Sequence, residues 1–125
     1  MNISCGVDII EIERIKNDIE GIGENFLKRV FTDKEIKYCE SKKVQKYQHY
    51  AARFAAKEAA FKAVSKYLDD KYSVCWKDFE VENDKQGRPK INLLNVNTNK
   101  IQSIDISISH CKLYAMASVT VLYKD

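Results

Sequence analysis

The chain has 125 residues, of which 45% are hydrophobic and 31% are charged, with one proline and four glycines. This composition predicts a single folded domain over residues 1–125 and argues against a disordered or linker-rich chain. The formal net charge of +3 does not require a nucleic-acid partner, and no segment approaches the roughly 20 apolar residues of a membrane span.

The N-terminal segment has no basic start followed by an apolar stretch, so we expect no signal peptide. The cysteines Cys5, Cys39, Cys75 and Cys111 are widely separated, and the sequence contains no C-x-x-C motif. This spacing does not favour a zinc site or a disulfide framework. We therefore expect reduced thiols in a cytoplasmic protein.

The first quarter of the chain predicts a strand followed by a helix. The apolar, β-branched stretch from Ile3 to Ile10 predicts a strand, which carries Gly6 and Asp8. Isoleucines then recur at helical spacing, which predicts an amphipathic helix ending near Gly21 and Gly23. These residues are Ile9, Ile12, Ile15 and Ile19.

Two further helical segments precede the middle of the chain. Apolar residues from Phe26 to Phe31 predict one or two helical turns. The pattern Thr32-Asp-Lys-Glu35 is a capping box, which predicts a helix that runs to about Cys39. Residues 41–46 are polar and basic and are predicted to be a connector.

A long helix is predicted from about Gln48 to Leu68, because this stretch lacks glycine and proline. Its aromatic and aliphatic stripe consists of Tyr50, Phe54, Phe61, Val64 and Leu68, and its opposite side of Ala52, Ala56, Ala59, Ala60 and Ala63. A helix that is apolar on nearly every side is usually buried, so charges within it are costly unless they are paired or bound. Those charges are Arg53, Lys57, Glu58 and Lys62. The ordinary alternative is a surface helix with one Glu58–Lys62 ion pair.

The second half of the chain predicts strands. Residues 79–81 and 91–93 predict a hairpin, joined by a turn over Asp84–Pro89. Ile104, Ile106 and Ile108 alternate with polar residues, which indicates a half-buried strand, and Leu113–Tyr123 follows as another strand after a turn at 110–112. We therefore predict an α+β fold with N-terminal helices and a long central helix packed on a mainly antiparallel sheet, which the first strand joins.

Two carboxylates from distant segments, Asp8 and Glu58, are the donors that Mg²⁺ commonly takes from a protein, with water and substrate phosphates completing the octahedron. Lys62, one helical turn beyond Glu58, would neutralise phosphate oxygens beside the ion. Arg88 and His110 are further candidate donors. Taken singly, each residue has an ordinary interpretation: Asp8 as a turn former, Arg88 as a surface charge and His110 as a turn residue.

The order of these residues resembles the holo-acyl-carrier-protein synthase family of 4′-phosphopantetheinyl transferases. Gly6-Val-Asp8-Ile-Ile-Glu-Ile-Glu-Arg14 is similar to the N-terminal G-x-D-x(5)-R signature of this family, and Arg53-Phe-Ala-Ala-Lys57-Glu58-Ala-Ala-Phe-Lys62 is similar to its central F-x-x-K-E-x-x-x-K signature. Gly87-Arg88-Pro89 and Ser107-Ile-Ser-His110 match two weaker features in the same order. The resemblance covers nearly the whole chain. It departs at Phe61, where many members carry a small or polar residue.

The resemblance implies transfer of the phosphopantetheine arm of coenzyme A to a serine of apo-acyl carrier protein, with release of adenosine 3′,5′-bisphosphate, in fatty acid and lipid biosynthesis. It implies that Asp8 and Glu58 bind Mg²⁺ and that Lys62 stabilises phosphate charge. Glu58 is also a candidate to accept the serine proton, directly or through water. Candidate coenzyme contacts are Arg53, Lys57, Lys62, Gly87, Arg88, Pro89 and His110.

The resemblance also implies partners and an assembly. Arg14, on the outer side of the first helix, is a candidate for docking the acidic carrier protein. The short family members form homotrimers with sites between subunits, so some residues would serve a neighbour's site. We expect Ala52, Ala56, Ala59 and Ala63, with the strands Ile104–Ile108 and Leu113–Tyr123, to provide the face buried between subunits.

Two other classes of protein are weighed against this interpretation. A non-catalytic nucleotide- or coenzyme A-binding module would keep the basic groups but would not need the carboxylates of Asp8 and Glu58. A small nucleic-acid-binding domain would need a continuous basic face with exposed aromatic residues. Here the aromatic residues follow the predicted core stripe, so we expect no nucleic-acid partner and no membrane partner.

Overall fold

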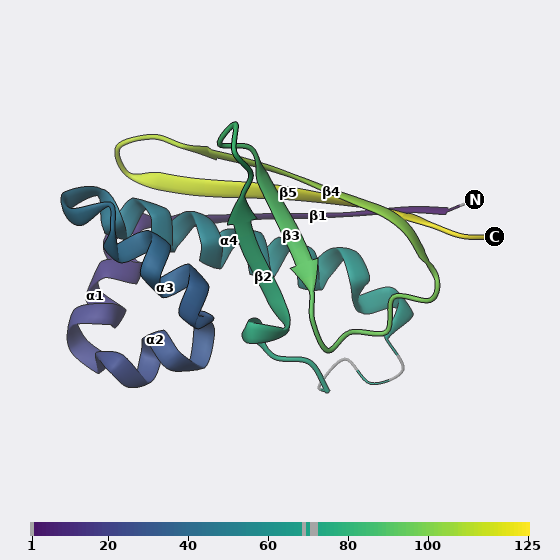
Figure 1. Cartoon of the computed structure of the whole chain (residues 1–125), viewed down its shortest axis with the longest axis horizontal. Coiled ribbons are helices and arrows are strands. Elements are labelled where there is room, and N and C mark those ends of the chain that lie inside the picture. The colour runs from purple at the N-terminus through teal and green to yellow at the C-terminus, as the bar shows by residue number, and fades with distance from the viewer. Residues whose placement is uncertain (1, 69, 71–72) are drawn as a thin grey trace.

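One long helix, α4 (Lys46–Val64), lies across one face of a three-stranded antiparallel sheet (Figure 1). This arrangement is seen in a computed structural model that describes residues 2–68, 70 and 73–125. The strand order is β1 (Asn2–Glu11), β5 (Tyr114–Tyr123) and β4 (Ile101–His110). The first and last strands of the chain are therefore neighbours, and both termini lie at the same end of the molecule.

Three short helices gather at the other end of α4 (Figure 1). They are α1 (Ile12–Ile22), α2 (Glu24–Val30) and α3 (Asp33–Glu40). The capping box at the start of α3 is confirmed: the Thr32 side chain accepts from the Glu35 backbone N–H, and the Glu35 side chain accepts from the Thr32 backbone N–H. A 3₁₀ turn, η1 (Lys43–Gln45), then leads into α4.

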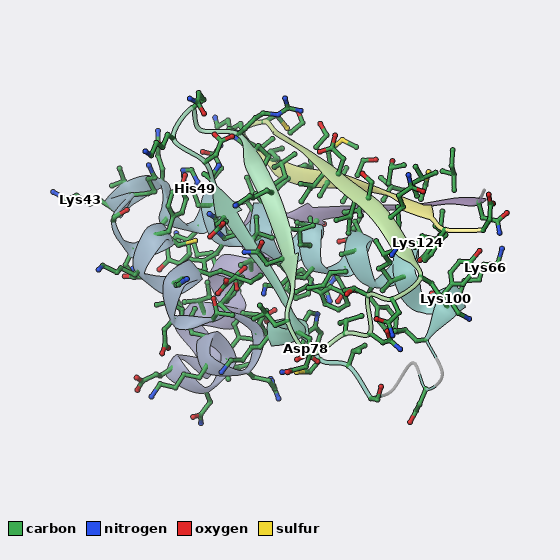
Figure 2. All side chains as sticks on the ribbon, turned by 45° about the vertical axis from the view of Figure 1, so that its right-hand side comes forward. Lys43, His49, Lys66, Asp78, Lys100 and Lys124 are labelled. Carbon is green, nitrogen blue, oxygen red and sulfur yellow. The ribbon has the colours of Figure 1, made fainter. Side chains whose placement is uncertain are left out.

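The predicted hairpin is present but forms a sheet of its own. It consists of β2 (Phe79–Asn83) and β3 (Pro89–Leu93), which pair only with each other among the described strands. A 3₁₀ turn, η3 (Trp76–Asp78), precedes β2, and Asp78 lies at the open end of the hairpin (Figure 2). The α+β class is confirmed, with the strands divided between two sheets rather than joined in one.

The central helix is shorter than the sequence predicted. The α-helix ends at Val64 instead of continuing to Leu68, and the chain passes through a 3₁₀ turn, η2 (Ser65–Tyr67). The sequence holds no glycine or proline there, so it gives no stop signal. Within residues 2–68, 70 and 73–125, no helix is long and apolar enough to cross a membrane.

The sheet has one buried face and one exposed face. On β5, Ala115, Ala117, Val119, Val121 and Tyr123 point toward α4 and are buried, whereas the residues between them are exposed or partly exposed. β1 follows the same period of two, with Gly6 and Ile10 buried. The outer face therefore displays apolar side chains: Ile3, Val7, Ile9, Tyr114 and Met116.

The alanine side of α4 forms the close contact with the sheet. A Cβ atom built on Gly6 would lie 1.9 Å from the carbonyl oxygen of Ala59 and 3.0 Å from the backbone nitrogen of Ala63, so only glycine fits there. Ala52, Ala56, Ala59 and Ala63 are all at most 5% exposed. The expectation that these alanines face another subunit is wrong, because β1 and β5 of the same chain already cover them.

Candidate functional site

Asp8 and Lys62 meet where β1 crosses α4. Asp8 follows Gly6 by two residues and so points to the same side of the strand, toward the helix. Lys62 Nζ lies 3.4 Å from Asp8 Oδ1 and donates to the backbone carbonyl oxygen of Val7 at 2.9 Å. The Lys62 side chain is 52% exposed and that of Asp8 is 20% exposed, so both groups remain accessible to a ligand.

Glu58 lies one turn before Lys62 on α4 and is partly buried. Its Oε1 accepts a hydrogen bond from the indole Nε1 of Trp76 at 2.6 Å. Glu58 lines a pocket of about 310 Å³ together with Phe61, Trp76 and the short segment Val74–Cys75. The ring of Phe61, at the position where the sequence departs from the family signature, is thus part of the wall beside Glu58.

The donor set here suits a hard cation that keeps part of its coordination sphere for substrate. Among the described residues there is no group of three or more His, Cys, Asp and Glu side chains that would enclose an ion. Asp8 and Glu58 offer two carboxylates, from β1 and α4. Mg²⁺ is commonly held by one or two carboxylates plus water and substrate phosphates, so these residues fit it.

Lys57, a candidate coenzyme contact, is buried and paired within the chain. Its side chain is fully buried, and its Nζ lies 2.6 Å from Glu35 Oε1. The amino group also donates to the backbone carbonyl oxygens of Trp76 and Phe79. Burial lowers the pKa of Lys57 below its usual value, and the Glu35 carboxylate opposes that shift. Lys57 thus joins α3, α4 and η3 inside the fold, and it also lines the pocket beside Glu58.

Glu35 is the acceptor at the centre of this buried cluster. Its Oε1 accepts from the Thr32 backbone N–H, and its Oε2 accepts from the Val81 backbone N–H at 2.9 Å. The Thr32 hydroxyl in turn donates to Glu80 Oε2 at 2.7 Å. One side chain thus caps α3, pairs with α4 and fixes β2. The capping-box pattern predicted the first of these contacts and not the other two.

Arg53 is also buried, at 3% exposed, on the same side of α4 as Lys57. Its Nη2 donates to Asn83 Oδ1 at 2.8 Å, and its guanidinium lies 4.0 Å from the centre of the Tyr38 ring. Its Nε is buried without a hydrogen-bond partner in the described part of the chain. Asn83 Nδ2 donates to the carbonyl oxygen of Gly87, so Arg53 reaches the Gly87–Pro89 segment through Asn83. Sequence reasoning missed Asn83.

Gly87, Arg88 and Pro89 form the end of a tight turn. Asp84 Oδ1 accepts from the backbone N–H groups of Gln86 and Arg88, and Gly87 has a φ of 83°, which favours glycine. The Arg88 side chain is exposed. Arg88 and Pro89 line a shallow pocket of about 470 Å³ over the outer face of the sheet, with Asp105, Ser107, Ser118 and Thr120. They do not share the pocket that Glu58 lines.

His110, the last residue of β4, contacts the first part of α4. Gln48 Nε2 donates to His110 Nδ1 at 2.8 Å. Gln48 precedes Glu58 by ten residues, which is about 15 Å along a helix axis. Burial and the nearby charges of Arg53, Lys42 and His110 lower the pKa of the adjacent His49, labelled in Figure 2. Within one chain, His110 and the Asp8–Lys62 contact therefore lie at different positions along the axis of α4.

Arg14 lies on α1, away from this cluster. Ile15 and Ile19 are buried, at 1% and 8% exposed, whereas Arg14 is exposed on the opposite side of the helix. This agrees with the orientation predicted from the isoleucine spacing. The structure brings Asp8, Glu58 and Lys62 into one region and leaves Arg14, Arg88 and His110 on other parts of the surface.

Comparisons with known proteins point to one family. The sequence model of the 4′-phosphopantetheinyl transferase superfamily matches residues 4–119. A holo-[acyl-carrier-protein] synthase from Ruminiclostridium cellulolyticum is 41% identical, over 100% of this chain and 96% of the relative. Another, from Protochlamydia amoebophila, is 43% identical over 94% of this chain and 95% of the relative. The crystal structure of Helicobacter pylori holo-[acyl-carrier-protein] synthase in complex with coenzyme A is 30% identical, with a TM-score of 0.81, and the match covers 94% of this chain and 99% of that one.

Proposed function

This chain belongs to the 4′-phosphopantetheinyl transferase superfamily, and on that premise we propose which of its residues carry the reaction. It is a holo-acyl-carrier-protein synthase. It transfers the 4′-phosphopantetheine group of coenzyme A to a serine of apo-acyl carrier protein and releases adenosine 3′,5′-bisphosphate.

Asp8 and Glu58 hold Mg²⁺ in this proposal. When bound, the ion supplies charge neutralisation and alignment for the pyrophosphate of coenzyme A. Lys62 binds the phosphate oxygens, and its present contacts with Asp8 and the Val7 carbonyl hold its amino group beside that position. Glu58 accepts the proton of the attacking serine, directly or through water.

The contact between Asp8 and Lys62 carries this assignment. These residues are 54 positions apart in the sequence, yet their side chains meet at 3.4 Å because Gly6 lets β1 approach α4. A surface ion pair alone would explain the distance but contributes little to stability. It would not explain why Glu58, a third charged side chain, lies one turn away beside a pocket.

The test uses apo-carrier protein, coenzyme A and Mg²⁺. Mass spectrometry should show the carrier gaining the mass of one phosphopantetheine group, and chelation of the metal should stop the gain. Asp8→Asn and Glu58→Gln should each cost several kcal/mol of transition-state stabilisation. Glu24→Gln is the matched control, because Glu24 is an exposed carboxylate paired with Lys28 on α2. Full transfer in excess chelator would contradict the metal assignment.

A homotrimer with sites between subunits is the assembly that we propose. The support is the outer face of β1 and β5, where Ile3 is 68%, Ile9 63% and Val7 54% exposed. An apolar patch of this kind on a folded domain usually marks an interface. Sharing of sites would also bring the exposed Arg88 and His110 of one chain to the Asp8 and Glu58 of another. Light scattering of the wild type and of Met116→Glu tests this, and an active wild-type monomer would refute it.

Arg14 is proposed to dock the acyl carrier protein. Its exposed position on α1 supports this, since it is separate from the Asp8–Lys62 contact and free to meet an acidic partner. We also propose a cytoplasmic location. All four cysteines lie within the described residues and are unpaired, and Cys5, Cys75 and Cys111 are exposed, which suits a reducing compartment.

A further inference from the structure

Trp76 holds the carboxylate of Glu58. Its indole Nε1 donates to Glu58 Oε1 at 2.6 Å, and an indole N–H acts only as a donor. A hydrogen bond to a charged acceptor is shorter and stronger than one between neutral groups. In the described part of the chain, Oε1 is the Glu58 oxygen with a hydrogen-bond partner, which leaves Oε2 available to a ligand.

Trp76 is itself fixed at several points. Its backbone carbonyl oxygen accepts from Lys57 Nζ at 3.1 Å, so the adjacent residues Lys57 and Glu58 bind the backbone and the side chain of one tryptophan. Its ring lies against Phe54, with a centroid distance of 6.0 Å and an angle of 32°. Asp78 closes the same 3₁₀ turn by accepting from the Cys75 N–H. The indole therefore approaches Glu58 from a rigid support.

We propose that Trp76 is a positioning residue that sets the orientation of the Glu58 carboxylate for the metal. The proposal rests on the proposed function, because it takes Glu58 as a magnesium ligand. Outer contacts of this kind orient the ligating oxygens, and their removal typically weakens metal affinity by about 10–100-fold. Without the indole N–H, the Glu58 carboxylate rotates about its terminal torsion, which is broad and roughly two-fold.

Trp76→Phe removes the N–H while keeping an aromatic ring beside Phe54 and the backbone bond from Lys57. We expect the Mg²⁺ concentration for half-maximal transfer to rise by about 10-fold or more, with kcat at saturating Mg²⁺ nearly restored. Tyr123→Phe is the matched control. It also removes one hydrogen bond from an aromatic side chain to α4, the 2.9 Å bond to the Ala63 carbonyl oxygen, but away from Glu58. Its Mg²⁺ requirement should equal that of the wild type.

A second readout does not depend on turnover. Trp76 is the single tryptophan of the chain, so all tryptophan emission comes from the residue that contacts Glu58. Titrating the wild-type protein with Mg²⁺ in the presence of coenzyme A should change the emission, and Glu58→Gln should abolish that change. An emission that ignores Mg²⁺ in a protein whose transfer requires it would overturn the proposal.

The outcomes separate this proposal from the one it rests on. If wild-type transfer needs no divalent metal, the metal role of Glu58 fails. If transfer needs Mg²⁺ but Trp76→Phe has the wild-type requirement, Glu58 keeps its role and the positioning role of Trp76 is wrong. A lower kcat at saturating Mg²⁺ with an unchanged half-saturating concentration would also overturn it, since that is the result of a purely structural role.

Discussion

Replacing Lys57 with methionine should destabilise the fold strongly. The Lys57 amino group is fully buried and lies 2.6 Å from a Glu35 carboxylate that is also fully buried. Methionine keeps most of the volume of the lysine stem but leaves the Glu35 charge without its partner. Removing one member of a buried ion pair costs about 3–5 kcal/mol, because the remaining charge stays desolvated. That is a large share of the roughly 5–15 kcal/mol that stabilises a typical domain.

Removing the Glu35 charge as well should recover only part of this cost, because Lys57 and Glu35 also form other hydrogen bonds. Lys57 also donates to the carbonyl oxygens of Trp76 and Phe79, and each lost bond is worth about 1 kcal/mol. Glu35→Gln removes the charge and keeps one acceptor oxygen, for the N–H of either Thr32 or Val81, because the amide nitrogen takes the place of the second oxygen. The double variant Glu35→Gln/Lys57→Met should therefore be more stable than the sum of the single changes predicts, by roughly 2–3 kcal/mol.

Urea unfolding followed by circular dichroism measures these free energies. All variants must be compared at one protein concentration, because the apparent stability of any protein that assembles depends on its concentration. Lys28→Met is the control, since Lys28 forms an ion pair with Glu24 at a similar distance, 3.1 Å, but both side chains are more than 60% exposed. It should change the free energy of unfolding by less than about 1 kcal/mol. If Lys57→Met behaves like Lys28→Met, the buried pair is not stabilising the fold.

Three further changes test other parts of the structure. Gly6→Ala should cost roughly 3 kcal/mol of stability and most of the activity, because the added Cβ would overlap the Ala59 carbonyl oxygen. Gly21→Ala is the control, because a Cβ atom at Gly21 meets nothing within 4 Å. A similar urea midpoint for both variants would contradict the close approach of β1 to α4. Arg14→Glu should raise KM for apo-carrier by roughly tenfold, weaken its salt dependence and leave KM for coenzyme A unchanged; an unaltered KM for carrier would remove the docking role. The pKa of His49 is lowered below 6.5 in the fold, so the unfolded chain binds the proton more readily than the folded chain. The stability that neutral His49 contributes should therefore be fully present above pH 6.5 and should decrease as the pH drops below it. In thermal melts, His49→Gln should show a smaller decrease over the same pH range.

Local patterns predicted most of the elements, because their signals lie within a few residues. The Thr32–Glu35 capping box is an example, since both of its bonds span three residues. The partner of Glu35 in the ion pair could not be found in this way. Lys57 is 22 residues further along the chain, and the family resemblance made it a candidate for the coenzyme. A charge in a buried helix needs a partner, but local sequence patterns do not identify that partner.

The sequence predicted which residues form the candidate site better than it predicted how they are arranged. The family signatures pointed to Asp8, Glu58 and Lys62, which the structure brings into one region. Sequence reasoning did not assign Trp76 to the site, because its contact with Glu58 depends on the path of the chain between α4 and β2. For the face expected between subunits, the sequence prediction was wrong about the alanines of α4, which face the core. The predicted strand Leu113–Tyr123 does carry exposed apolar side chains, but the prediction did not include those of β1.

The two sides of strand β1 differ in composition, and this limits where the chain can gain or lose a residue. Its inner side carries Gly6 and Asp8, and its outer side carries Ile3, Val7 and Ile9, so two different surfaces share one backbone. Because successive side chains point to opposite sides, deleting one residue within the part of β1 that pairs with β5 would exchange the two sets over the shifted part of the strand. Asp8 would then point away from α4, and Cys5 or Val7 would replace Gly6 beside the Ala59 carbonyl oxygen, where a Cβ atom does not fit. A substitution on one side of this strand changes one of the two surfaces, whereas an insertion or a deletion within the strand would disturb both at once.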